Sequence, residues 1–202
     1  MKKAQRRSLR GFTLIELMMT LTIFGILLMV GVPALRGFIV SSDLTGQAND
    51  ILAAINLARA EAVRRGQRVI FCPVQTAAGV PSTDTCTDPG ADSWPGWMVF
   101  VDSNSSGAHD PNEEVVRAGT LGGGSVLSKS SLSLSGAANR IVFRPDGIAK
   151  AHGGLTIQQV ALRICDPSGA SAHNLRDIVL TFGSRVSVSR ATDATCATPA
   201  NP

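Results

Sequence analysis

The first feature of the chain is an uncharged, mostly apolar run from Leu17 to Leu35, which follows a short basic start. The run is 19 residues long. A helix of that length extends about 28 Å, enough to cross the hydrocarbon core of a bilayer. The sequence therefore predicts a membrane-spanning helix over residues 12–40. Glu16 lies at the edge of this run, where a carboxylate is costly unless it reaches the interface or finds a cationic partner.

After this run, hydrophobic residues recur at a helical spacing. Intervals of three or four residues separate Leu44, Ala48, Ile51, Ile55, Ala58 and Ala62. This spacing gives a helix one apolar stripe. Gly66 is a suitable helix stop. We therefore expect the helix to continue to about residue 65 and to pack its stripe on a β-sheet.

The rest of the chain has the pattern of β-strands. Two near-continuous apolar runs, 68–72 and 96–101, predict strands that are covered on both faces. Shorter strands are predicted at 140–143, 160–165, 177–182 and 185–188, and surface loops at 76–93 and 119–139. The predicted fold class is α+β, with a long N-terminal helix packed on an antiparallel β-sheet. Residues 41–202 form one globular head.

The net charge of the chain comes from its N-terminus. The 202-residue chain has a formal net charge of +4, but five of its 19 basic residues precede Phe12, which leaves 14 basic against 15 acidic residues. The charge therefore indicates a cytoplasmic N-terminal tail and an outward head, rather than nucleic-acid binding. The apolar run is long for a secretory signal and no clear A-x-A site follows it, which favours an uncleaved anchor.

All four cysteines follow the apolar run, so they face an oxidising compartment if this topology holds. Four cysteines allow three pairings. We favour Cys72–Cys86 and Cys165–Cys196, the pairs nearest in sequence. A zinc site is disfavoured because there is no CxxC or HxxxH spacing and the three histidines are scattered.

The start of the chain resembles a known processing signal. A basic leader ends in Gly11, and Phe12-Thr13-Leu14-Ile15-Glu16-Leu17 opens the apolar helix. This arrangement resembles the class III signal of type IV pilins and type II secretion pseudopilins. The resemblance implies a leader over residues 1–11, cleavage by a prepilin peptidase between Gly11 and Phe12, and methylation of the new amine. It also implies a helix kink at Pro33.

Motifs in the head narrow the resemblance to the GspH/FimT/FimU group of minor pilins and pseudopilins. They are Ala58-Arg59-Ala60-Glu61-Ala62-Val63, Cys72-Pro73, the Trp94–Asp102 segment, Glu114-Val115-Val116-Arg117 and Phe143-Arg144-Pro145-Asp146-Gly147. The resemblance implies that Glu16 pairs with the N-terminal amine of a neighbouring subunit. The alternative is that Glu16 extends to the lipid headgroups.

The same resemblance implies partners and a location. The partners are other major and minor pilins, prepilin peptidase and the bacterial inner membrane. The chain is expected to be a single-pass inner-membrane protein with a periplasmic head, which later joins a filament.

One loop has the ligand order of a calcium site. Oxygen side chains occupy positions 1, 3, 5, 9 and 12 of the segment 102–113, with glycine at position 6. These residues are Asp102, Asn104, Ser106, Asp110 and Glu113. The flanking segments are predicted strands rather than helices, and only three carboxylates contribute. We therefore favour a polar hairpin turn over a calcium site.

The C-terminal half is basic. Residues 140–190 hold seven basic against three acidic residues. Some members of the resembling group bind DNA through a Gly-Arg-x-Arg motif, but here Ser184 separates Gly183 from Arg185, and the next arginine is Arg190. In a regular strand these two arginines point to opposite faces. Double-stranded DNA is a candidate partner only if Arg163, Arg176, Arg185 and Arg190 converge.

No spacing of Ser, His and Asp suggests a catalytic nucleophile, so we expect no enzyme activity and no resident cofactor. Two hypotheses remain. The first is a minor pilin that primes or caps assembly of a type IV pilus, with a tip pseudopilin of type II secretion as its alternative. The second is a pilus-borne DNA receptor. The resemblance favours the type IV pilus, through the paired cysteines and Cys72-Pro73.

Overall fold

The computed structural model describes residues 11–90, 93–123 and 125–202, without the side chains of residues 30, 33 and 34. Its first element is α1 (Leu14–Arg65), a helix of 52 residues. Gly66 ends this helix with a φ of 65°, in the left-handed region that glycine adopts without steric cost. The predicted helix stop is therefore confirmed. Residues 1–10 of the predicted leader lie outside the described residues.

Two four-stranded antiparallel sheets and a short ribbon make up the described β-structure. The first sheet has the order β5 (Val115–Thr120), β4 (Gly96–Asp102), β1 (Arg68–Val74) and β7 (Ile141–Phe143). The second has the order β10 (Arg185–Ala191), β9 (Leu175–Thr181), β8 (Val160–Cys165) and β6 (Leu127–Ser130). The smaller elements are β2 (Thr76–Ala77), β3 (Val80–Pro81), α2 (Leu132–Ser135) and the 3-10 turn η1 (Phe182–Ser184).

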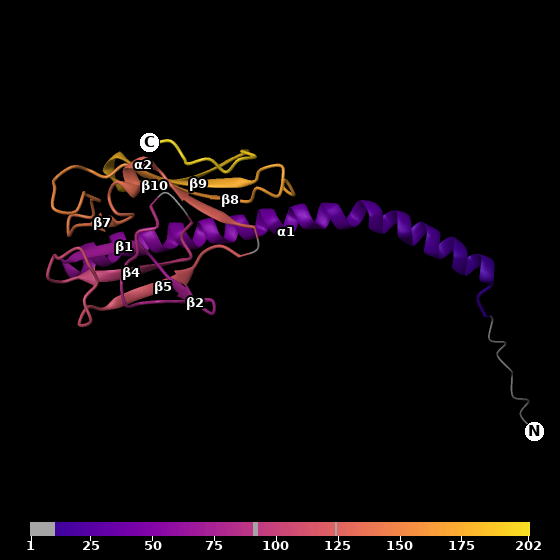
Figure 1. The fold of residues 1–202 in the computed structure, drawn as a ribbon, viewed down its shortest axis with the longest axis horizontal. Coiled ribbons are helices and arrows are strands. Elements are labelled where there is room, and N and C mark those ends of the chain that lie inside the picture. Colours follow the sequence, from indigo (N-terminus) through magenta and orange to yellow (C-terminus); the bar gives the residue numbers. More distant parts are fainter. Residues whose placement is uncertain (1–10, 91–92, 124) are drawn as a thin grey trace, which may run out of the picture.

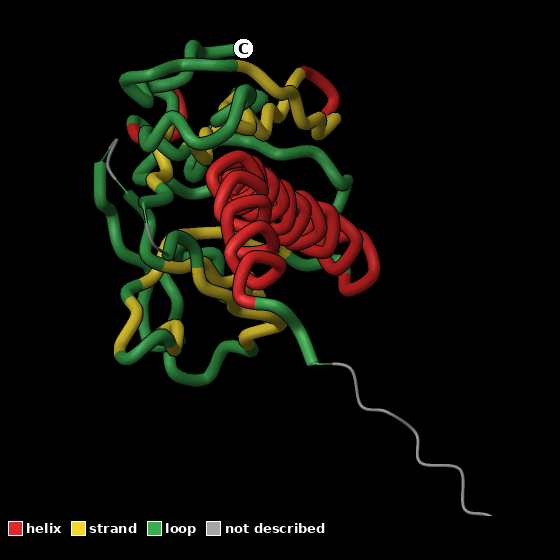
Figure 2. Tube along the Cα trace, turned by 90° about the vertical axis from the view of Figure 1, so that its right-hand side faces the viewer, coloured by secondary structure: helices red, strands yellow, loops and turns green. Residues whose placement is uncertain are grey.

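The C-terminal half of α1 lies between the two sheets. Figure 1 shows β1, β4 and β5 on one side of this helix and β8, β9 and β10 on the other, and Figure 2 shows the same arrangement almost end-on. All six residues of the predicted stripe are at most 2% exposed. They share one core with Phe71 of the first sheet and Leu162 and Ile178 of the second.

The α+β class is therefore as predicted, but the structure has two four-stranded sheets where the sequence predicted one. A sequence pattern shows which face of a helix is apolar, and it does not show how many sheets cover that face. Alanines at positions 48, 54, 58 and 62 are all buried, and their small side chains allow both sheets to approach α1 closely.

The prediction that β1 and β4 are covered on both faces is confirmed. Their outer faces form a second cluster from Ile70, Cys72, Met98 and Phe100, which packs against Cys86 of the 76–93 loop. The ring of His109 also contacts Phe100, with 5.1 Å between ring centroids. Loops on the outside of the sheet thus exclude water from these strands.

The segment 119–139 was predicted to be a loop, and this was wrong. It holds all of β6 and α2, and it begins within the last two residues of β5. The buried residues of strand β6 are serines rather than apolar residues. Burial of these serines is possible because Trp94 supplies their hydrogen-bond partners. The backbone N–H of Trp94 donates to Ser128 Oγ at 2.7 Å, and its indole Nε1 donates to Ser130 Oγ at 2.9 Å. Such a strand has no local sequence signal.

Candidate functional site

The predicted processing and assembly residues lie at the exposed start of α1. Thr13 is the N-cap, and its Oγ1 accepts a hydrogen bond from the backbone N–H of Glu16 at 3.3 Å. The Thr-x-x-Glu spacing is a helix-start signal that our sequence reasoning did not use. Glu16 lies in the first turn, where the helix dipole favours a negative charge. Its carboxylate makes no ion pair within the described residues.

The N-terminal half of α1 extends away from the head and exposes its large apolar side chains (Figure 1). Phe12 is 83% exposed and Met29 is 82% exposed. Other exposed side chains of this half are Leu14, Ile15, Leu17, Met18, Met19, Leu21, Ile23, Phe24, Ile26, Leu27, Leu28, Val32, Leu35, Phe38 and Ile39. A continuous apolar surface of this kind marks a protein or membrane contact.

In the part of the chain that the structure describes, no helix is both long enough and apolar enough to cross a membrane. The membrane-spanning assignment of residues 12–40 therefore stays a prediction. Pro33 lies within α1, and its expected kink also stays a prediction.

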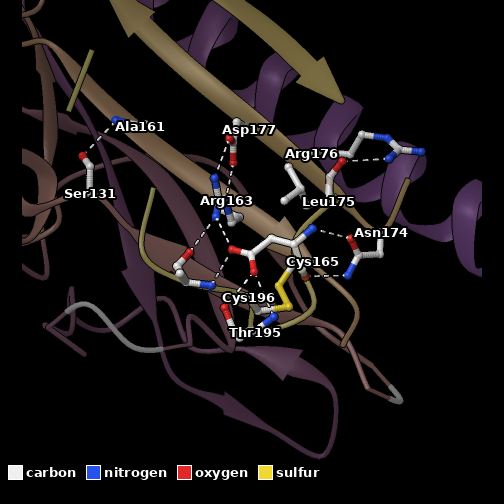
Figure 3. A network of polar contacts seen from close by, with 12 residues as sticks. Ser131, Ala161, Arg163, Cys165, Asn174, Leu175, Arg176, Asp177, Thr195 and Cys196 are labelled. Carbon is white, nitrogen blue, oxygen red and sulfur yellow. Dashed lines mark hydrogen bonds and ion pairs between the residues drawn. A yellow bond between two sulfur atoms is a disulfide. The ribbon is translucent and has the colours of Figure 1, made fainter. Parts of the chain in front are cut away.

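Both predicted disulfides are present. Cys72 and Cys86 are joined with 5.7 Å between their Cα atoms, and Cys165 and Cys196 with 5.9 Å. The first bond attaches the 76–93 loop to the outer face of β1. The second attaches the C-terminal tail to β8, next to Leu175, as Figure 3 shows.

Arg163 is held in a network on the outer face of the second sheet. It lies directly opposite Asp177, and its Nε and Nη2 donate to that carboxylate at 2.7 and 2.9 Å. Its Nη1 donates to Asp193 Oδ2 at 3.1 Å and to the carbonyl of Ala197 at 2.8 Å (Figure 3). The hydrogen bond to Asp177 raises the pKa of Arg163. This guanidinium secures the C-terminal tail and has few donors left for a ligand.

Arg176 lies on the opposite face of the same sheet and is only 1% exposed. Its guanidinium donates to Thr45 Oγ1 and to the carbonyls of Ser41, His173 and Leu175. Burial lowers the pKa of Arg176, and the charge of Arg190 directly across from it adds to this effect. Arg176 therefore fixes α1 to β9 and does not face solvent.

The four arginines of the DNA hypothesis do not form one surface. Arg163 is paired and Arg176 is enclosed, while Arg185 and Arg190 are exposed. Exposure alternates along β10 up to Ser189, with Val186 and Val188 half-buried toward the core. The side chains of Arg185 and Arg190 thus lie on opposite faces of the strand, as the sequence predicted. DNA binding stays a prediction that this geometry does not support.

The loop predicted as a calcium candidate is closed by its own hydrogen bonds. Asn104 Nδ2 donates to Asp110 Oδ2 at 2.7 Å, and the N–H of Ser103 donates to Glu113 Oε1 at 2.7 Å. Asp102 is 1% exposed, and burial raises its pKa, opposed by the N–H of Gly107. These bonds match the hairpin turn that we favoured. Among residues 11–90, 93–123 and 125–202, no three His, Cys, Asp or Glu side chains lie where they could share a metal ion.

Comparison with known proteins identifies families and relatives that are similar to this chain. A family described as type II transport protein GspH matches residues 47–190, and the prokaryotic N-terminal methylation motif matches residues 6–32. The pilin-like protein PilA1 of Thermus thermophilus is 31% identical over 105 residues, which cover 52% of this chain and 56% of PilA1. The chain thus spans about half the length of that relative.

Two crystal structures of the type IV minor pilin FimU of Pseudomonas aeruginosa are similar to the chain. They have TM-scores of 0.47 and 0.46 at 12% and 13% identity. They cover 78% and 75% of this chain and 98% and 99% of the FimU chains. The GspH match by itself spans most of the head, and the methylation motif spans the start of α1. The chain therefore belongs to the GspH family, as a type IV minor pilin or pseudopilin with an N-terminal methylation motif.

Proposed function

We propose that this chain is a non-enzymatic subunit of a type IV pilus that primes or caps filament assembly. Cleavage between Gly11 and Phe12 by a prepilin peptidase, followed by methylation of Phe12, prepares it for assembly. The observation that carries the proposal is the half of α1 whose large apolar side chains are exposed and which carries Glu16 at its start. The inner membrane covers this surface before assembly, and neighbouring pilins cover it in the filament.

Glu16 sets the axial position of each subunit relative to its neighbours in the filament. Cleavage after Gly11 leaves a positive amine on Phe12 of each subunit, four residues before Glu16. In a filament the apolar helices bury Glu16, and a buried carboxylate requires a cationic partner. The amine of a neighbouring subunit provides one, and only one axial position of the two helices brings the charges together.

Substitution of Glu16 by Gln tests this pairing, because it keeps the shape and removes the charge. Breaking a buried ion pair costs about 3–5 kcal/mol, so we expect a reduction of more than a hundredfold in filament incorporation. Membrane insertion should be unchanged. Asp43→Asn is the matched control, since Asp43 is an exposed acid of α1 beside the head. Normal incorporation of Glu16→Gln in sheared filaments would remove the basis of the proposal.

Gly11→Ala tests the processing step. Among the described residues other than its chain neighbour, no atom lies within 4 Å of a Cβ added at Gly11, so the substitution meets no part of the head. We expect the full-length precursor to accumulate in the membrane, because the peptidase no longer cleaves after residue 11. A band of mature size on an immunoblot contradicts the assignment of the cleavage site.

A pseudopilin of type II secretion is the alternative system, and the GspH family name favours it. The two systems differ in where the protein is found and in what its deletion affects. Recovery of the protein in sheared surface pili supports the pilus. Loss of exported proteins on deletion, with normal pili, supports secretion. A DNA-receptor role is retained only as a second alternative.

A further inference from the structure

The first sheet carries a pocket at its β7 edge that the filament role does not use. It has a volume of about 420 Å³ and lies between the turn after α2 and the segment after β7. Its lining includes Ser133, Ala137, Ala138, Arg140, Val142 and His152. A smaller cavity of about 220 Å³ shares Ser133, Ala137 and Ala151 with it. We call the larger cavity the Arg140 pocket; its volume is within the range of about 300–1,000 Å³ typical of small-molecule sites.

A constrained turn positions Arg140. The two preceding residues, Ala138 and Asn139, have φ angles of 51° and 57°, a left-handed conformation that is unusual for consecutive residues other than glycine. Asn139 is fully buried, and its Nδ2 donates to Asp88 Oδ1 at 2.7 Å and to the carbonyl of Gly90 at 2.6 Å. Strained backbone that is held by its surroundings is frequent at binding sites.

The backbone of Arg140 is fixed from the other side as well. Gln158 Nε2 donates to the carbonyl of Arg140 at 2.9 Å, while Gln158 Oε1 accepts from the N–H of Val142 at the same distance. Gln158 is only 6% exposed. The backbone position of Arg140, directly before β7, is therefore set before any ligand is present.

The side chain of Arg140 has unused donors. Its Nε is buried and has no hydrogen-bond partner, and the guanidinium makes no ion pair within the described residues. Arg65 and Arg163, in contrast, are each paired with two carboxylates. The two Nη groups also have no hydrogen-bond partner among the described residues, so their donors are available to a ligand oxygen that enters the pocket.

His152 contacts a neighbouring loop. Its ring packs on Gly107, so closely that a Cβ on that residue would lie 2.3 Å from the ring. Gly107 also has a φ of 78°, so its position suits glycine on both counts. The imidazole lines the Arg140 pocket and offers a second hydrogen-bonding group.

We propose that the Arg140 pocket binds a small ligand with one anionic group, a carboxylate or a phosphate. The two Nη groups of Arg140 can donate to two oxygens of such a group, and His152 provides a further contact. The alanines and Val142 leave room for an uncharged body. Figure 1 shows β7 at the end of the head away from the exposed half of α1, so covering that half does not by itself block the pocket.

Calorimetric titration of the full chain in detergent micelles tests this proposal. The probes are glucuronate and glucose 6-phosphate, with glucose as the neutral control. We expect saturable binding of at least one of the two anionic sugars and none of glucose. Comparison of the two anions identifies which group the pocket prefers. No saturable binding of either anion, or equal binding of glucose, overturns the proposal.

Variants locate the binding. Arg140→Gln should weaken binding roughly tenfold or more, because it removes a charge-assisted pair of hydrogen bonds, while Arg140→Lys should weaken it less. Arg117→Gln is the control, since it removes the same charge from β5, at the opposite edge of the sheet from β7. His152→Ala tests the same pocket if Arg140→Gln does not fold. Unchanged affinity in folded Arg140→Gln, or equal weakening in Arg117→Gln, shows that the anion binds elsewhere and overturns the proposal.

Discussion

Removal of the Cys165–Cys196 disulfide should destabilise the head by a predictable amount. The bond joins residues 31 positions apart, and both cysteines are at most 2% exposed. The loop-closure relation gives about 4 kcal/mol for a loop of this length at 25 °C. The Cys72–Cys86 bond has a separation of 14 positions, for which the same relation gives about 3 kcal/mol.

The folded tail should keep its position without this disulfide. Arg163 still donates to Asp193 and to the carbonyl of Ala197, and the N–H of Asp193 still donates to Asn174 Oδ1 at 2.9 Å. The loss of stability therefore acts mainly through the unfolded chain, which gains freedom when the loop is opened. We expect Cys165→Ala with Cys196→Ala to keep the native circular dichroism spectrum.

Chemical denaturation followed by tryptophan fluorescence measures the effect. Trp94 and Trp97 are 1% and 2% exposed in the core, so both indoles report unfolding of the head. The free energy of unfolding should fall by about 4 kcal/mol, and the denaturant slope should rise because the unfolded state expands. Cys72→Ala with Cys86→Ala serves as the comparison, with a slightly smaller loss. A decrease below about 1 kcal/mol for the 165–196 pair would refute the loop-closure reasoning.

Two further predictions concern charge. Hydrogen bonds from Arg64 and Arg65 lower the pKa of Glu61 from 4.5 to about 2. The ionised Glu61 carboxylate therefore stabilises the folded state above pH 4.5, and this stabilisation is lost as the pH falls toward 2. Denaturation curves should show the loss, and Glu61→Gln should make the free energy of unfolding depend less on pH between these values. For DNA, we expect the full chain with Arg185→Gln and Arg190→Gln to show the same salt dependence of double-stranded DNA affinity as the wild type, because the four candidate arginines do not share a face. A log–log salt slope shallower by about two in the variant would instead establish a receptor surface on β10.

Local signals predicted the long helix and its end. The 3.6-residue period of the stripe requires only neighbours in sequence, and Gly66 supplies a conformation that few other residues adopt. The two fully buried strands were also predictable, because uninterrupted apolar runs are rare outside cores. The disulfides followed sequence proximity, which brings nearby cysteines together more often than distant ones.

Contacts between distant segments explain the errors. Strand β6 is polar in sequence and becomes buried only because Trp94 satisfies Ser128 and Ser130. The set of DNA-binding arginines was chosen from net charge along the chain, which does not reveal that Asp177 lies opposite Arg163. Arg140 was counted among the basic residues and was not singled out, since its unused donors depend on a turn fixed by Asp88 and a glutamine 18 residues later.

The sequence by itself determined the N-terminal signal, the apolar surface of α1 and the α+β class, because each depends on residue type and local period. Only the tertiary structure decided that two sheets enclose the C-terminal half of α1, which arginines are paired, and where a pocket with an unpaired guanidinium lies. The physical reason is that a side chain's charge is a property of the residue. Its partners and its exposure to water depend on segments that the fold brings together.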